Sequence, residues 1–177
     1  MKGIIAAAAL IGIAAGCAGP SAQTQTAPKQ ATATANLEPR SGSQVSGKIT
    51  FTQAGADIVR VSGEVRGHSK GPKGFHLHEK GDCSDPKAMS AGGHFNPTKH
   101  KHGGPYDPQR HAGDLGNLNF NDAGVAKVDF VVGGISVSRN LVDGIIGRAV
   151  VVHLDRDDLK SDPTGNAGGR AACGVIQ

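Results

Sequence analysis

The sequence predicts an all-β fold, built as an antiparallel sandwich or barrel. Two observations lead to this prediction. Short segments rich in β-branched residues recur between turn signals, and 27 glycines and nine prolines supply those turns. In addition, no segment combines capping residues with the 3.6-residue apolar repeat that is typical of a helix. The length of 177 residues indicates one domain.

Seven segments are candidate strands: residues 45–51, 58–65, 74–79, 115–120, 125–132, 145–154 and 172–176. Turns at residues 53–56 and 121–124 join two pairs of these strands. Residues 80–113 and 155–169 are long polar segments with many glycines. Loops of this length inside a compact domain are usually functional, so we expect the site on them.

The N-terminus resembles a bacterial lipoprotein signal. A lysine at position 2 and an apolar run over residues 4–15 precede Ala-Gly-Cys17, which predicts a signal peptide over residues 1–16 and a lipid, such as palmitate, on Cys17. An ordinary signal peptide with an incidental cysteine is the alternative. Residues 17–43, rich in Ala, Thr, Gln, Ser and Pro, are predicted to be a flexible tether, and residues 44–177 the functional domain. The protein is then exported and anchored at the extracytoplasmic face of a membrane.

The cysteine count agrees with export. There are three cysteines, and an odd number in an exported protein needs an explanation. Lipidation of Cys17 leaves Cys83 and Cys173 as a pair in an oxidising compartment. The long loop that such a bridge would close implies about 4–5 kcal/mol of stabilisation.

The charge pattern argues against nucleic acid as a partner. The formal net charge is +4, and the lysines do not alternate with aromatic residues that could stack on bases. A modest positive charge fits attraction of small anions or acidic surfaces. An ordinary solvated surface explains it equally well.

Eight histidines are many for this length, and three of them map to strands. His76 and His78 are two residues apart on a predicted strand, so both rings face the same side. Two surface histidines on a strand are the alternative. His153 ends another strand and becomes a ligand candidate only because this pair needs partners.

A second group lies in or at the end of the long loop. It consists of His94, His102, His111 and Asp114, a nitrogen and oxygen set that suits tetrahedral zinc. The alternative is that these histidines are solvated in a polar loop. That alternative explains any single histidine but explains the cluster poorly. Four zinc ligands and four nitrogens for a tetragonal Cu(II) site make eight positions for seven side chains. One imidazole must therefore bind both ions.

Several motifs in order make the chain similar to the copper–zinc superoxide dismutase family, in its bacterial lipoprotein form. The resemblance runs from about residue 44 to the C-terminus, on Gly74-Phe-His-Leu-His-Glu79, Gly81-Asp-Cys83, Ala91-Gly-Gly-His-Phe-Asn-Pro97, Lys101-His-Gly-Gly-Pro105, Arg110-His-Ala-Gly-Asp-Leu-Gly116, Gly147-Arg-Ala-Val-Val-Val-His153 and the segment from Gly165 to Ile176. It implies a Greek-key sandwich or flattened barrel of about eight strands, with two long functional loops.

The resemblance also implies roles for individual residues. Copper is then held by His76, His78, His94 and His153, and zinc by His94, His102, His111 and Asp114. It further implies that His94 is the bridge, that Arg170 guides the anion, that Asp157 links His76 to His102, and that Cys83 and Cys173 form the family disulfide. His68 and His100 match no ligand position and are interpreted as surface residues.

The implied activity is conversion of two superoxide anions to O₂ and hydrogen peroxide, by alternating reduction and reoxidation of copper beside a structural zinc. A metal carrier without turnover and a structural or adhesive lipoprotein are the rival functions. Residues 158–169 form a shorter loop than in many relatives, which weakens the expectation of electrostatic steering. Family members occur as dimers and as monomers, so a homodimer is a candidate assembly.

Overall fold

The structure is a computed structural model that describes residues 30–177. The predicted signal peptide, Cys17 and the first part of the predicted tether lie outside the described residues. The described part contains one short 3₁₀ helix, η1 (Met89–Ala91), and eight strands: β1 (Thr32–Pro39), β2 (Ser46–Gln53), β3 (Ile58–Arg66), β4 (Gly71–His78), β5 (Asp114–Phe120), β6 (Val125–Gly133), β7 (Ala149–His153) and β8 (Arg170–Val175). The prediction of an all-β fold is confirmed.

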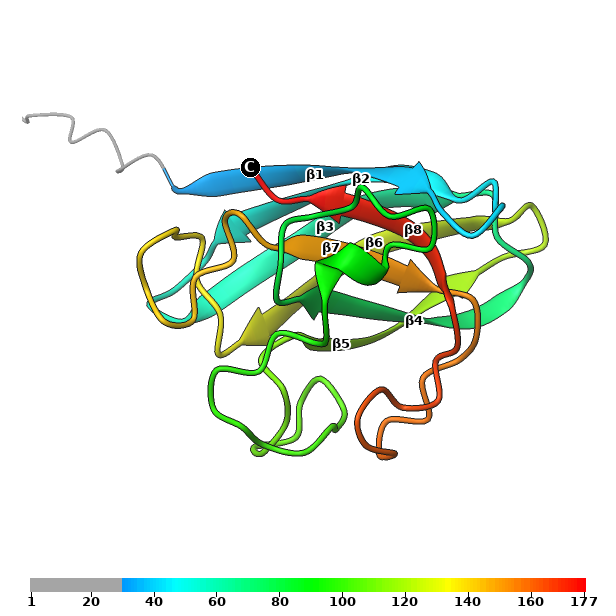
Figure 1. The fold of residues 1–177 in the computed structure, drawn as a ribbon. Helices are drawn as coiled ribbons and strands as arrows, with labels where there is room; N and C mark the ends of the chain where they lie inside the picture. The colour runs from blue at the N-terminus through cyan, green and yellow to red at the C-terminus, as the bar shows by residue number, and fades with distance from the viewer. Residues whose placement is uncertain (1–29) are drawn as a thin grey trace, which may run out of the picture.

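The strands form a nearly closed barrel with antiparallel neighbours, in the order β5-β4-β7-β8-β1-β2-β3-β6. β1 pairs with β2 along most of its length and with β8 only at Glu38 and Pro39, so it joins the two halves of the barrel. β5 and β6, at the two ends of this order, also contact each other. The two halves lie face to face around the core (Figure 1).

The core follows from alternation along the strands. On β2 and β3 the inward side chains are Ile49, Phe51, Val59, Val61 and Val65, and all are fully buried. The five residues of β7 are all buried, because one face of β7 packs in the barrel and the other packs beneath η1. A strand that is covered on both faces needs a continuous apolar run, which this segment has.

The tether prediction was wrong for residues 32–39, which form β1. Ala33, Ala35 and Leu37 are buried and alternate with exposed or half-buried residues. These small side chains gave a weak period-two signal in a segment dominated by Ala and Thr. The same end of the chain is fixed by Arg40, whose Nε donates to the carbonyl oxygen of Cys83 over 2.9 Å.

The strand that carries His153 is shorter than predicted. β7 begins at Ala149, because residues 145–148 form a turn in which the amide of Arg148 donates to the carbonyl oxygen of Ile145. β4 instead begins three residues earlier than predicted, at Gly71. Neither change moves a candidate ligand off its strand.

The second predicted loop and the later part of the first lie on the same side of the barrel, whereas the earlier part of the first loop, with η1, crosses the front of the barrel (Figure 1). The first loop is tied to β8 by a disulfide between Cys83 and Cys173, as expected. The first loop follows β4, which carries His76 and His78, and the second follows β7, which ends at His153. Within residues 30–177, no helix is long and apolar enough to cross a membrane.

Candidate metal centre

Strand pairing brings the first histidine group together. β4 carries His76 and His78, and it pairs with β7 so that His76 lies opposite Val151 and His78 opposite Ala149. His153 ends β7. On the other side of β4, an isolated bridge pairs His78 with His94. The four histidine rings therefore come from three separate segments of the chain: β4, the first loop and β7.

The four rings form a compact, buried group. One nitrogen from each of His76, His78, His94 and His153 lies within 4.8 Å of the others. The Nε2 atoms of His78 and His153 are 3.4 Å apart. Four neutral imidazoles in this arrangement match a copper site rather than a cluster of surface residues.

The second group is arranged around the carboxylate of Asp114. Its Oδ1 lies 2.9 Å from Nδ1 of His94, 3.0 Å from Nδ1 of His102 and 3.2 Å from Nδ1 of His111. Its Oδ2 accepts the backbone amides of Gly103 and His111. The amides fix the carboxylate, so that one oxygen and three nitrogens converge as a tetrahedral zinc site requires.

His94 belongs to both groups. Its Nδ1 faces Asp114, whereas its Nε2 is buried and has no hydrogen-bond partner among residues 30–177. Nδ1 of His76 is unpaired in the same way. Buried nitrogens without partners are costly. Both atoms lie on residues of the first group, where a bound ion would satisfy them, so the residues present fit copper and zinc.

Asp157 connects the two groups from behind. Its Oδ2 lies 2.8 Å from Nε2 of His76, and its Oδ1 lies 2.9 Å from Nε2 of His102. These contacts occupy the outer nitrogen of each ring and direct the Nδ1 atoms inward. Such outer carboxylates orient metal-binding histidines and set their tautomer. The structure thus places Asp157 where the sequence analysis expected it.

The electrostatics of the groups favour ligand forms of the side chains. Burial lowers the pKa of His78 and of His153 well below the usual value, and it lowers the pKa of His94 to about 4. Burial raises the pKa of Asp114, but hydrogen bonds from the histidines outweigh this effect and hold it far below its ordinary range. Three neutral imidazoles and a carboxylate are therefore present at neutral pH, ready for cations.

His102 behaves differently. Burial lowers its pKa, but hydrogen bonds to Asp114 and Asp157 outweigh burial and raise the pKa to about 9. A ring that lies between two carboxylates keeps its proton unless a cation replaces it. We therefore expect binding of an ion by the second group to release a proton near neutral pH.

Arg170 places a positive charge beside the first group. It lies opposite His153 at the start of β8. Its Nη1 donates to the carbonyl oxygen of Ala88 over 2.5 Å, and its Nη2 donates to that of Gly92 over 2.6 Å. The Gly92 oxygen also lies 2.9 Å from Nδ1 of His78. The half-buried guanidinium is thus held at the edge of the histidine group.

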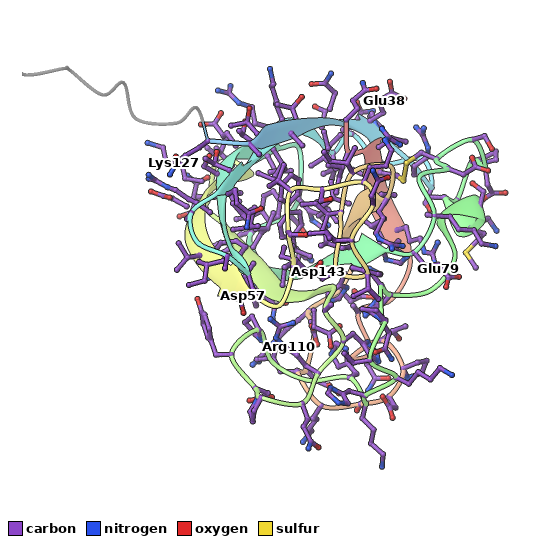
Figure 2. The ribbon with its side chains drawn as sticks, turned by 90° about the vertical axis from the view of Figure 1, so that its left-hand side faces the viewer. Glu38, Asp57, Glu79, Arg110, Lys127 and Asp143 are labelled. Atoms are coloured by element: carbon purple, nitrogen blue, oxygen red, sulfur yellow. A yellow bond between two sulfur atoms is a disulfide. The ribbon has the colours of Figure 1, made fainter. Side chains whose placement is uncertain are left out.

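Three residues of the site were missed or misjudged from the sequence. Asn117 exchanges two hydrogen bonds with the backbone of Asp157 and thereby holds it. His68 is half-buried, and its Nε2 lies 3.1 Å from the carbonyl oxygen of His153. Arg110 donates to the carbonyl oxygens of Pro105, His111 and Gly133, and Figure 2 shows it between the barrel and the loops. All of these contacts go to backbone atoms, which sequence patterns do not reveal.

A β-barrel with two adjoining ligand groups that share one imidazole defines a metalloprotein with a binuclear centre. The family model for copper/zinc superoxide dismutase matches residues 45–176. The chain is 46% identical over 163 residues to an extracellular Cu-Zn superoxide dismutase of Drosophila melanogaster, covering 88% of each chain. It is also similar to the crystal structure of the clock protein EA4, with 45% identity and a TM-score of 0.75, covering 87% of this chain and 98% of that one.

The chain belongs to the copper/zinc superoxide dismutase family, so it is an enzyme whose metals are copper and zinc and whose reaction is the dismutation of superoxide. The prediction of family, fold, activity and cofactors is therefore confirmed. The rival functions of metal storage and adhesion find no support in these comparisons.

Proposed function

We propose that His76, His78, His94 and His153 hold copper, and that His94, His102, His111 and Asp114 hold zinc. One observation supports this assignment above all: the two ring nitrogens of His94 face different ligand groups. Nδ1 lies beside Asp114, whereas Nε2 is buried and has no hydrogen-bond partner in the described part of the chain. A single imidazole between the groups gives eight ligand positions from seven side chains. Copper, when bound, exchanges single electrons with superoxide, whereas zinc is not redox-active.

The protein groups have distinct tasks in this proposal. Asp157 keeps Nε2 of His76 and of His102 occupied, so that both rings present Nδ1 to the ions. His94 can hold a proton at Nε2, because Asp114 and the zinc side retain Nδ1. Burial outweighs the hydrogen bond to Asp114 and lowers the pKa of His94 to about 4, so this ring gives up a proton readily.

Arg170 is the anion-docking residue. Its guanidinium is a permanent cation at the edge of the copper group, and the hydrogen bonds to Ala88 and Gly92 fix its direction. A fixed cation beside the site raises the local concentration of a small anion and aligns it. We expect Arg170 to contribute more to the rate than Arg156 or Lys160, which lie in the second loop, residues 155–169.

We further infer that the protein is exported and lipid-anchored. Disulfides such as that between Cys83 and Cys173 form and persist mainly in oxidising compartments, and the similar Drosophila protein is named extracellular. Residues 1–16 would be the signal peptide, Cys17 the lipidated residue, and residues 18–31 the tether that leads into β1. Mass spectrometry of the N-terminal peptide would detect the acyl chains, and Cys17→Ser should abolish them and release the protein from membranes.

A homodimer remains part of the proposal, and nucleic acid does not. Analytical ultracentrifugation of the mature domain measures the assembly directly. A sedimentation coefficient that corresponds to twice the mass of one chain would establish the homodimer, and a single-chain value would establish a monomer, the other assembly that occurs in the family.

The main experiment measures metal content and superoxide decay on one preparation. We expect one copper and one zinc per chain, and decay of superoxide much faster than in buffer when it is followed by pulse radiolysis or stopped flow. The same protein stripped of both metals is the control and should not accelerate decay. Metal binding without accelerated decay would leave only storage and overturn the proposal.

A further inference from the structure

Arg148 is a half-buried cation that the dismutation chemistry leaves without a task. It directly precedes β7, and the register that places Ala149 opposite His78 puts Arg148 beside Glu79, at the end of β4. Figure 2 labels Glu79 on the flank of the barrel that carries η1. Arg148 is therefore the residue before the first residue of β7, the strand that ends at His153.

The side chain of Arg148 crosses the end of β4 and reaches the next segment. Its Nη1 donates to the carbonyl oxygen of Glu79 over 2.9 Å, and its Nε donates to that of Gly144 over 2.7 Å. Its guanidinium carbon lies 3.5 Å from the ring centroid of Phe95, which is 3% exposed. A guanidinium over an aromatic ring at this distance forms a cation–π contact, which is stronger where the cation is partly desolvated.

The two contacted residues each follow a histidine of the centre. Glu79 follows His78, and Phe95 follows His94. The two segments are held together by a narrow pairing, in which the amide of Phe95 donates to Leu77 and the amide of Glu79 donates to Gly93. This is an isolated bridge rather than a full strand ladder. Arg148 adds contacts to both segments from outside this bridge.

We propose that Arg148 is a positioning residue that holds the His94 segment against β4, and so fixes His94 relative to His78. The proposal rests on the proposed ligand assignment, in which both residues bind copper and His94 also binds zinc. The ring of His94 must satisfy two ions at once, so a small rotation of its segment disturbs both sites. Arg148 is suited to this task because its planar guanidinium can stack on the Phe95 ring and donate hydrogen bonds at the same time. A lysine ammonium cannot do both.

The test compares Arg148→Lys with Arg60→Lys in full-length, copper- and zinc-loaded protein. Arg60 is the matched control because it pairs with Asp129 on the exposed face of β3, far from the ligands in the strand order. The first measurement is the Cu(II) electron paramagnetic resonance spectrum. The second is the rate at which a chelator removes copper, because residues behind metal ligands typically change metal affinity by 10–100-fold.

For Arg148→Lys we expect an altered Cu(II) spectrum and copper loss about tenfold faster, whereas Arg60→Lys should match the wild type in both. Phe95→Leu should repeat the Arg148→Lys result, and it tests the stacked contact if the lysine variant folds poorly. If Arg148→Lys and Phe95→Leu both kept the wild-type Cu(II) spectrum and the wild-type rate of copper release, the positioning role would be overturned. Failure of the wild type itself to bind both metals would instead overturn the ligand assignment, so the two failures are distinguishable.

Discussion

Gly165 is the residue at which one added methyl group should damage the metal centre most selectively. It lies in the second loop with φ at +62°. A Cβ at this position would overlap Oδ1 of Asp157 and lie 2.6 Å from Nε2 of His102. Gly165→Ala therefore forces the Asp157 carboxylate away from the ring that it orients.

The magnitude has two parts. A left-handed backbone conformation costs an alanine about 1 kcal/mol. Displacing Asp157 from His102 removes a hydrogen bond to a charged group, which contributes about 1.5–3 kcal/mol. Because outer carboxylates of this kind typically affect metal affinity by 10–100-fold, we expect zinc affinity to fall by about that factor.

Gly42→Ala is the matched control. Gly42 has φ at +73°, but a Cβ there would meet no atom within 4 Å. Gly42→Ala therefore carries only the free-energy cost of placing an alanine in the left-handed conformation. Zinc affinity, measured by competition with a chromophoric chelator, should fall for Gly165→Ala and stay unchanged for Gly42→Ala. Equal zinc affinities in the two variants would refute the role of Asp157 in orienting His102.

Three further predictions concern the copper group and its surroundings. His153→Ala should abolish dismutation while zinc stays bound, as metal analysis would show; retained turnover would mean that a copper ligand is misplaced. Arg170→Ala should slow superoxide decay with both metals intact, and an unchanged rate constant would remove it from the site. In metal-free protein, the lowered pKa values of His78, His94 and His153 mean that only the unfolded chain takes up their protons as pH falls below about 6.5. The free energy of unfolding in urea should therefore be lower at pH 5 than at pH 7, whereas equal values would show that these rings are not held neutral by the fold.

The strands that sequence predicted best are those with β-branched, alternating side chains. β2 and β3 fall within two residues of their predicted bounds, because residues such as Ile49 and Val61 mark the inward face unmistakably. β1 was assigned to the tether, since its inward residues are Ala33, Ala35 and Leu37. Alanine carries little period-two information, so tertiary pairing with β2 decides the structure of this segment.

The candidate ligands could be predicted because their chemistry is rare and their order is distinctive. Spacing alone placed His76 and His78 on one face of a strand. The division into two groups and the bridge at His94 followed from ligand counting and from family resemblance. Geometry now gives that division a physical basis, because Nδ1 and Nε2 of His94 have different surroundings.

The supporting residues could not be predicted in the same way. Each contacts a backbone group: Arg148 that of Glu79, Asn117 that of Asp157, and His68 that of His153. Every residue has the same backbone carbonyl group, so the sequence does not show which carbonyl accepts a hydrogen bond from a side chain. Only the fold decides which carbonyl a long side chain reaches, so these residues emerge from the structure.

The central claim is that two ions lie on opposite sides of the His94 ring. Anomalous diffraction from crystals of the copper- and zinc-loaded protein, recorded at both absorption edges, tests it most directly. The account predicts a copper peak enclosed by His76, His78, His94 and His153, and a zinc peak enclosed by His94, His102, His111 and Asp114. Peaks at other residues, or a single peak on one side of His94, would contradict it.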